Sequence, residues 1–130
     1  MQKNKVVLVI DDVESVLQLI RGALVGRPLD VLTASDGATG LALAHEFKPD
    51  LVLLDLALPV MDGWGILAAL RTDPDTAQVP VVIVTAHGDS DTAAQARELG
   101  ADGFISKPFR PSELRRVIDG YLAPPVSAAG

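Results

Sequence analysis

The amino-acid sequence predicts a single α/β domain in which one parallel β-sheet lies between two layers of helices. Short apolar runs alternate five times with longer stretches that carry apolar residues at helical spacing. The first run, Val6 to Ile10, has no polar position, which is typical of a strand covered on both faces. Right-handed crossover helices then place the five strands parallel in one sheet.

The length and composition exclude several classes of protein. With 130 residues, 48% of them hydrophobic and 22% charged, the chain is expected to form one globular core. The absence of cysteine excludes disulfides, thiolate catalysis and cysteine metal sites. A formal net charge of -6 argues against direct binding to nucleic acid, because such binding needs Lys and Arg to neutralise phosphates. No apolar run is long enough to span a membrane and residues 1–5 lack a signal-peptide pattern, so we expect a cytoplasmic location without a membrane partner.

The N-terminal half is expected to form three strands and two helices. Apolar runs predict the strands, and helical spacing between turn residues predicts the helices. In chain order these elements are a strand at residues 6–10, a helix at 13–24, a strand at 29–34, a helix that follows the turn at Asp36-Gly37 and ends by Lys48, and a strand at 51–54. Asp30 and Thr33 make the second strand partly polar, as in a strand at the edge of a sheet. The second helix ends before Pro49, because the residue that precedes a proline disfavours helical geometry.

The C-terminal half is expected to add three helices and two strands. In chain order these are a helix that follows Asp62-Gly63 and is closed by Asp73-Pro74, a strand at residues 79–84, a helix at 90–99, a strand at 103–106 and a helix at 111–122. The helix at 90–99 should be the most loosely held, because its inward residues are mostly Ala93, Ala94 and Ala96, which bury little area. The last helix should face inward with Tyr121 among other apolar residues. The domain is expected to span residues 1–122, and residues 123–130 to form a flexible tail or the remnant of a linker.

Polar residues end four of the predicted strands. Asp11 and Asp12 follow the first strand, Asp55 follows the third, Thr85 the fourth and Lys107 the fifth. The carboxyl ends of parallel strands form the usual ligand crevice of such a sheet. Carboxylates that meet there repel one another unless a cation lies among them, and oxygen ligands of this kind suit Mg2+. We expect Asp12 and Asp55 to share one ion, and Lys107 and Thr85 to help hold a tetrahedral anion against Asp55.

These motifs resemble those of a two-component response-regulator receiver domain, from about Lys5 to Leu122. The acidic pair, the phospho-acceptor aspartate, the switch threonine and the lysine of that family match the strand-ending residues above. Its characteristic turns match Pro59-Val60-Met61-Asp62-Gly63 and Lys107-Pro108-Phe109. The resemblance implies a flavodoxin-like (βα)5 fold with strand order 2-1-3-4-5, and a cis peptide bond before Pro108. Because the chain stops before any effector domain, we expect a single-domain, chemotaxis-regulator-like member, with an excised receiver as the alternative.

The resemblance also implies a mechanism. Asp55 is expected to accept a phosphoryl group from a phosphohistidine on a sensor histidine kinase or a phosphotransfer protein. Mg2+ would be held by Asp12, Asp55 and the backbone carbonyl of Ala57, with Asp11 acting through water, and would neutralise charge on the transferring oxygens. Lys107 would supply a positive charge to the same oxygens. The domain would catalyse only its own phosphorylation and dephosphorylation, so no enzyme activity on other substrates is expected.

Switching and rate control are expected from four residues in this resemblance. Thr85 would hydrogen-bond the phosphoryl group, and its loop would move inward, followed by Phe104. Because Phe104 lacks the hydroxyl of a tyrosine, burying it should cost less, and we expect an easily populated inward state. Ala57 and His87 lie two residues beyond Asp55 and Thr85, where the family tunes hydrolysis of the acyl phosphate.

Three other functions compete with this hypothesis. An aspartyl-nucleophile phosphohydrolase needs a second acid two residues after the nucleophile, and Ala57 occupies that position. A flavin or nucleotide carrier needs a phosphate loop after the first strand, where Asp11 and Asp12 would repel phosphate. A receiver-like interaction scaffold that works without phosphorylation is the remaining alternative, and the complete set of site residues argues against it.

The expected output is a switched binding surface for a downstream protein target. A homodimer through the fourth helix, fifth strand and fifth helix is a further hypothesis, in which Arg110, Arg115 and Arg116 would pair with acidic residues of a second copy. As isolated features, these arginines and His45 are more typical of a solvated surface. Trp64 is more typical of core or of partial surface cover on the third helix.

Overall fold

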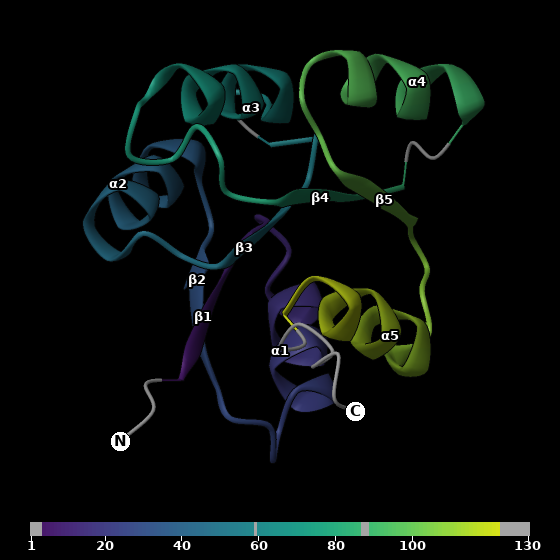
Figure 1. Ribbon diagram of the computed structural model, residues 1–130. Coiled ribbons are helices and arrows are strands. Elements are labelled where there is room, and N and C mark those ends of the chain that lie inside the picture. Colours follow the sequence, from purple (N-terminus) through teal and green to yellow (C-terminus); the bar gives the residue numbers. More distant parts are fainter. Residues whose placement is uncertain (1–3, 59, 87–88, 123–130) are drawn as a thin grey trace, which may run out of the picture.

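A computed structural model describes residues 4–58, 60–86 and 89–122 (Figure 1). In chain order the elements are β1 (Lys5–Ile10), α1 (Glu14–Ala23), β2 (Leu29–Ala34), α2 (Gly37–Phe47), β3 (Leu51–Leu54), α3 (Gly63–Thr72), β4 (Val81–Thr85), α4 (Ser90–Glu98), β5 (Gly103–Ser106) and α5 (Pro111–Leu122). β2, β3 and β5 have the predicted bounds. β4 starts two residues later and ends one residue later than predicted, so that it includes Thr85. The expected tail at 123–130 lies outside the described residues. Within the described ranges, no helix has the length and hydrophobicity needed to cross a membrane.

The strands form one parallel sheet in the order β2-β1-β3-β4-β5, which confirms the predicted topology. β1 and β3 are neighbours, and Ile10 is paired with Leu54. The next residues, Asp11 and Asp55, therefore leave the sheet side by side at its carboxyl edge. The amide of Asp55 continues the ladder by donating to the carbonyl oxygen of Ile10 at 3.0 Å.

Two apolar clusters fill the space on either side of the sheet. α2, α3 and α4 cover one face, and α1 and α5 cover the other (Figure 1). Successive residues of a strand point to opposite faces, so Leu8 and Leu54 belong to the first cluster, and Val9 and Leu53 belong to the second. β3 is buried along its whole length, whereas β2 is mostly half-buried, as expected for an edge strand.

Two residues that were expected to face the core, Ala94 and Tyr121, are exposed, and so is Val13, where the first helix was expected to begin. Val13 is the N-cap residue of α1 and 43% of its surface is exposed. On α4, Ala96 is buried, Ala93 is half-buried and Ala94 is exposed, because this short helix contacts the sheet along a narrow stripe. Tyr121 is 36% exposed, and its hydroxyl donates to a backbone carbonyl oxygen at 2.9 Å. That hydroxyl would have lacked a partner inside the apolar cluster.

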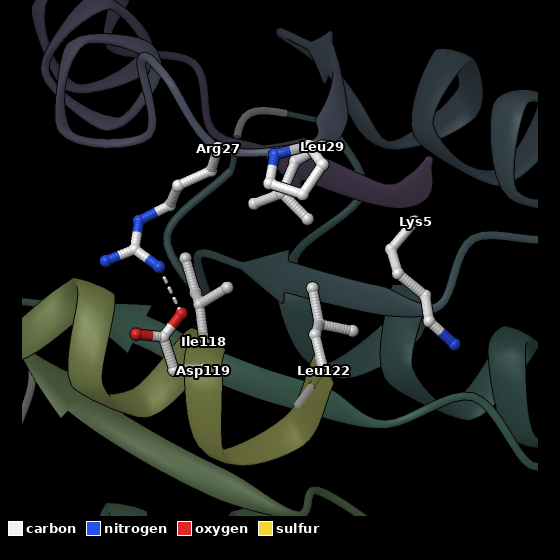
Figure 2. Close-up of a pocket in the computed structure, with 7 residues that line it drawn as sticks. Lys5, Arg27, Leu29, Ile118, Asp119 and Leu122 are labelled. Atoms are coloured by element: carbon white, nitrogen blue, oxygen red, sulfur yellow. Dashed lines mark hydrogen bonds and ion pairs between the residues drawn. The ribbon is translucent and has the colours of Figure 1, made fainter. Parts of the chain in front are cut away.

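A groove of about 420 Å³ lies at the amino-terminal edge of the sheet, opposite the edge that carries Asp55 (Figure 2). Its lining combines Leu29 of β2 with Ile118 of α5, and an ion pair joins Arg27 to Asp119 at its rim (Figure 2). Exposed ion pairs of this kind contribute little to stability. The apolar contacts therefore provide most of the attachment of α5 at this edge.

Gly63 begins α3 in direct contact with the backbone that follows β3. A Cβ atom added at Gly63 would lie 2.4 Å from the carbonyl oxygen of Asp55 and 2.4 Å from Cα of Leu56. Both are backbone atoms, which cannot rotate away as the end of a flexible side chain does. Only glycine allows α3 to start this close to the candidate site.

Replacing Gly63 by alanine is expected to lower the free energy of unfolding by about 2–3 kcal/mol, because the added methyl group overlaps backbone atoms. The matched control is Gly65→Ala, where the nearest atoms to an added Cβ lie at 3.6 Å, an ordinary contact distance. That control should be neutral or stabilise the domain by up to about 1 kcal/mol, as expected for alanine in a helix. Urea denaturation measures both, and equal losses for the two variants would contradict the role assigned to Gly63.

Candidate functional site

Asp11, Asp55 and Lys107 form an ion-pair network at the carboxyl edge of the sheet. The Nζ atom of Lys107 donates to Oδ2 of Asp11 at 2.7 Å and to Oδ2 of Asp55 at 3.0 Å. The exposed fraction of the side chain is 3% for Asp11, 6% for Asp55 and 15% for Lys107. Water is largely excluded from these three groups, so each depends on the others for compensation of its charge.

Backbone amides hold the other oxygen of each carboxylate. Oδ1 of Asp11 accepts a hydrogen bond from the amide of Val13 at 2.9 Å, and Oδ1 of Asp55 accepts one from the amide of Ala57 at 3.0 Å. Each aspartate thus bonds the amide two residues ahead, as in an Asx turn. Both carboxylates are fixed with their remaining oxygen toward Lys107.

Lys107 reaches this position from the far side of β4. Its amide donates to the carbonyl oxygen of Thr85 at 2.9 Å, which extends the pairing of β4 with β5 by one residue. β4 separates β3 from β5, so the long lysine side chain has to cross the width of one strand to reach Asp55. The peptide bond between Lys107 and Pro108 is cis, as the resemblance implies.

Burial and charge shift the pKa values of two groups in the network. Desolvation by burial raises the pKa of Asp11, and the hydrogen bonds from Lys107 and from the amide of Val13 offset this only in part. Burial alone would lower the pKa of Lys107, but its hydrogen bonds to Asp11 and Asp55 outweigh that effect, and the pKa lies above its usual value. Lys107 therefore carries its positive charge at neutral pH.

A third carboxylate, that of Asp12, stands at the exposed side of the network. One carboxylate oxygen from each of Asp11, Asp12 and Asp55 lies within 4.8 Å of the other two, and Asp12 is exposed to solvent. The described cluster has three carboxylates, and the ammonium group of Lys107 contacts two of them, so negative charge is in excess. An oxygen-only set of this kind fits a hard divalent cation.

The other expected site residues lie at the same edge or outside the described part of the chain. Thr85 is the last residue of β4 and is fully buried. Phe104, on the neighbouring strand β5, is half-buried against the cluster under α2, α3 and α4. Ala57 is exposed beside Asp55. His87 falls outside the described residues.

Arg71, whose role the sequence does not indicate, connects α3 to the loops around it. Its guanidinium group donates to the carbonyl oxygens of Val79 at 2.7 Å and Gly100 at 2.8 Å, and pairs with the carboxylate of Asp102 at 3.0 Å. These bonds connect α3 to the segments that lead into β4 and β5. An arginine in the last turn of an amphipathic helix is usually solvated, so no sequence signal distinguished it.

His45 and Trp64 lie as the sequence indicates. The side chain of His45 is 62% exposed, and its Nδ1 atom lies 3.0 Å from Oδ2 of Asp73. The pKa of Asp73 is lowered, first by a hydrogen bond from the amide of Asp75 and then by His45. Trp64 is half-buried in the first turn of α3 and packs against the core cluster.

Comparison with known proteins decides the family. The family model described as the response regulator receiver domain matches residues 7–119. The chain belongs to this family. Over 119 residues it is 38% identical to the alkaline phosphatase synthesis transcriptional regulatory protein PhoP of Bacillus subtilis, covering 92% of this chain and 49% of PhoP. The chain spans about half, or less, of the length of the curated relatives it matches.

Solved receiver structures share the fold of this receiver domain. Chemotaxis protein CheY4 of Vibrio cholerae superposes with a TM-score of 0.86 at 28% identity, covering 92% of this chain and 99% of that chain. The Mn2+-bound form of response regulator Rcp1 superposes with a TM-score of 0.75 at 27% identity, covering 89% and 90% of the two chains. As a receiver domain, the protein is a module of two-component signalling, in which histidine kinases phosphorylate receivers.

Replacing Lys107 by methionine is expected to destabilise the receiver domain by about 3 kcal/mol, because two buried carboxylates lose their cation. Adding Asp11→Asn to that variant should restore part of the loss, since one of the uncompensated charges is then removed. Urea denaturation in metal-free buffer measures both effects. The exposed Lys5→Met change is the control and should have little effect. Losses that simply add in the double variant would contradict the coupling of these residues.

Proposed function

We propose that Asp55 is the phospho-acceptor and that the domain is a phosphorylation-controlled binding module in phosphorelay signalling. The observation that carries this proposal is the buried carboxylate of Asp55, 3.0 Å from the ammonium group of Lys107 and grouped with two further carboxylates. A nucleophile, a fixed cation and metal-binding oxygens thus meet at one point of the sheet edge. The donor is a phosphohistidine of a sensor kinase or of a phosphotransfer protein.

In the proposed transfer, a carboxylate oxygen of Asp55 forms a bond to phosphorus while the phosphorus–nitrogen bond of the phosphohistidine breaks. The imidazole of the donor keeps the electron pair of that bond. Negative charge is spread over the phosphoryl oxygens during this step. Lys107 is already protonated and directed at Asp55, so it can stabilise that charge with little rearrangement.

The acidic cluster fits a magnesium ion. The donor atoms are all oxygens, and the exposure of Asp12 leaves a path for a hydrated ion. Asp12, Asp55 and the backbone carbonyl of Ala57 would hold it, with Asp11 acting through water. When bound, the ion supplies positive charge that neutralises the transferring oxygens. The Mn2+ of the Rcp1 structure supports a divalent cation in this class of site.

Thr85 and Phe104 are the proposed switch. The hydroxyl of Thr85 would hydrogen-bond the phosphoryl group on Asp55, and Phe104 would move inward on the adjacent strand. The half-buried position of Phe104 supports a short movement, and its ring has no hydroxyl that would lose a partner. Ala57 and His87 are the proposed rate-tuning positions, and the methyl group of Ala57 cannot orient an attacking water.

The proposed chemistry is limited to the phosphorylation and dephosphorylation of the domain itself. Its output would be contact with a downstream protein target in the cytoplasm, with no direct role for nucleic acid or membrane. A homodimer through α4, β5 and α5 stays a prediction. Arg110 and Arg116 are exposed and available to it, whereas Arg115 donates to the carbonyl oxygen of Ala23 on α1 at 3.4 Å.

Incubation with acetyl phosphate and Mg2+ is expected to add one phosphoryl group to the native domain and none to an Asp55→Asn variant. The amide of asparagine keeps the shape of the side chain but is a far weaker nucleophile. Intact-mass spectrometry measures the added group. An unmodified native domain, or a variant that is modified to the same extent, would overturn the proposal.

Removal of divalent cations with EDTA is expected to abolish this phosphorylation, and added Mg2+ should restore it. An Asp12→Asn variant should bind Mg2+ at least about tenfold more weakly, because affinity depends on the number of charged ligands. Isothermal titration calorimetry measures the affinity. Glu46→Gln removes an equal charge from the exposed surface of α2 and should leave the affinity unchanged. Equal affinities in all three proteins would contradict the metal site.

A further inference from the structure

A groove beside the candidate site has no part in the proposed phosphoryl transfer. It has a volume of about 420 Å³ and lies between the first turns of α3 and α4, which sit side by side on the same face of the sheet (Figure 1). Leu56 and Ala57, the two residues that follow Asp55, form part of its lining. A protein that brings a phosphohistidine to Asp55 must therefore cover or border this groove.

Two of the residues that the structure describes in the lining of this groove, Asp62 and Asp89, are charged, and both are acidic. Asp62 is the N-cap of α3 and accepts a hydrogen bond from the amide of Gly65 at 3.0 Å, and Asp89 is the N-cap of α4 and accepts one from the amide of Thr92 at 2.7 Å. These caps occupy amides that would otherwise attract an anion to a helix N-terminus. Both capping residues are acidic, so the described lining of the groove favours a cation over an anion.

The aromatic side chain of Trp64 also lines the groove. Trp64 is half-buried at the start of α3 and contributes to the groove together with Asp62 and Asp89. A cation over the face of an indole ring is attracted by the ring, and tryptophan is the strongest of the aromatic partners. A guanidinium group is planar, stacks on aromatic rings and pairs with carboxylates through a fork of N–H donors, whereas a lysine ammonium group lacks that shape.

We propose that this α3–α4 groove binds an arginine side chain of the protein that donates the phosphoryl group. The described lining of the groove is Leu56, Ala57, Asp62, Trp64, Asp89, Thr92 and Gln95. The assignment of the donor rests on the proposed role of Asp55 as phospho-acceptor. Two observations favour a basic partner surface: the acidic lining of the groove and the net charge of -6 for the whole chain. Complementary charge increases the rate of encounter and fixes the orientation of partners. An arginine held here would position the donor relative to Asp55.

The test titrates the 15N-labelled domain with N-acetylarginine amide and follows the indole N–H resonance of Trp64, the single tryptophan of the chain. N-acetylcitrulline amide is the control, because its side chain has nearly the same shape without the charge. We expect a saturable shift of the indole resonance in the millimolar range of the arginine compound. The citrulline compound should bind roughly tenfold more weakly or not at all. Equal responses to the two compounds would overturn the proposal.

Two double variants locate the binding. Asp62→Asn with Asp89→Asn removes both charges and keeps both helix caps, because asparagine caps helices as well as aspartate does. This variant should bind the arginine compound roughly tenfold more weakly. Glu46→Gln with Glu98→Gln removes the same total charge from exposed residues of α2 and α4 outside the groove, and should bind as the native domain does. If the variant with Asp62→Asn and Asp89→Asn binds the arginine compound as the native domain does, the groove is not its binding site.

The Asp55→Asn variant separates this proposal from the proposed function. It is expected to bind the arginine compound as the native domain does, since Asp55 does not line the groove. If the native domain binds the arginine compound but acetyl phosphate does not modify it, the phospho-acceptor role of Asp55 and the assignment of the donor are refuted. Binding of a cation in the groove would then still be supported. If the native domain is phosphorylated but does not distinguish the arginine compound from the citrulline compound, only the proposal of arginine binding in the groove is refuted.

Discussion

The pairing of one buried lysine with two buried aspartates is the interaction on which the carboxyl edge of this receiver domain depends. Asp11 and Asp55 end neighbouring strands, and without Lys107 their charges would repel each other in a site that excludes most water. Lys107 contacts one oxygen of each, and backbone amides hold the other two. The network thus fixes three strands at their ends while it orients the proposed nucleophile.

One side of the site is buried and the other is exposed to solvent, and this arrangement suits reversible phosphorylation. Asp11, Asp55 and Thr85 are buried, so the sheet preorganises the groups around the proposed nucleophile. Asp12 and Ala57 are exposed, so the ion, the phosphoryl donor and the hydrolytic water of the proposed mechanism would approach from that side. The apolar clusters on both faces make the sheet a rigid support for this edge.

The helix next to the proposed switch is the one with the fewest buried residues. Of the nine residues of α4, Ala96 is buried, whereas α3 buries Ile66, Leu67 and Leu70 along with Gly63. Elements with few buried apolar contacts move at low free-energy cost. In the proposed switch, a small displacement of Thr85 would therefore move α4 more readily than α3. The α3–α4 groove is bordered by α3, which is firmly packed, and by α4, which is loosely packed. A molecule bound in the groove would therefore be coupled to the proposed switch through α4.

The sequence by itself determined the order of the elements, the bounds of β2, β3 and β5, and the residues that end each strand, because apolar runs and turn residues report local burial along the chain. Strand order and the roles of the site residues came from the resemblance. Only the tertiary structure decided that Lys107 contacts both Asp11 and Asp55, that Arg71 joins distant loops, and that Val13 and Tyr121 lie outside the core. It also decided that two helix caps and an indole ring share one groove. These features depend on distances between residues far apart in the sequence, and periodicity carries no information about such distances.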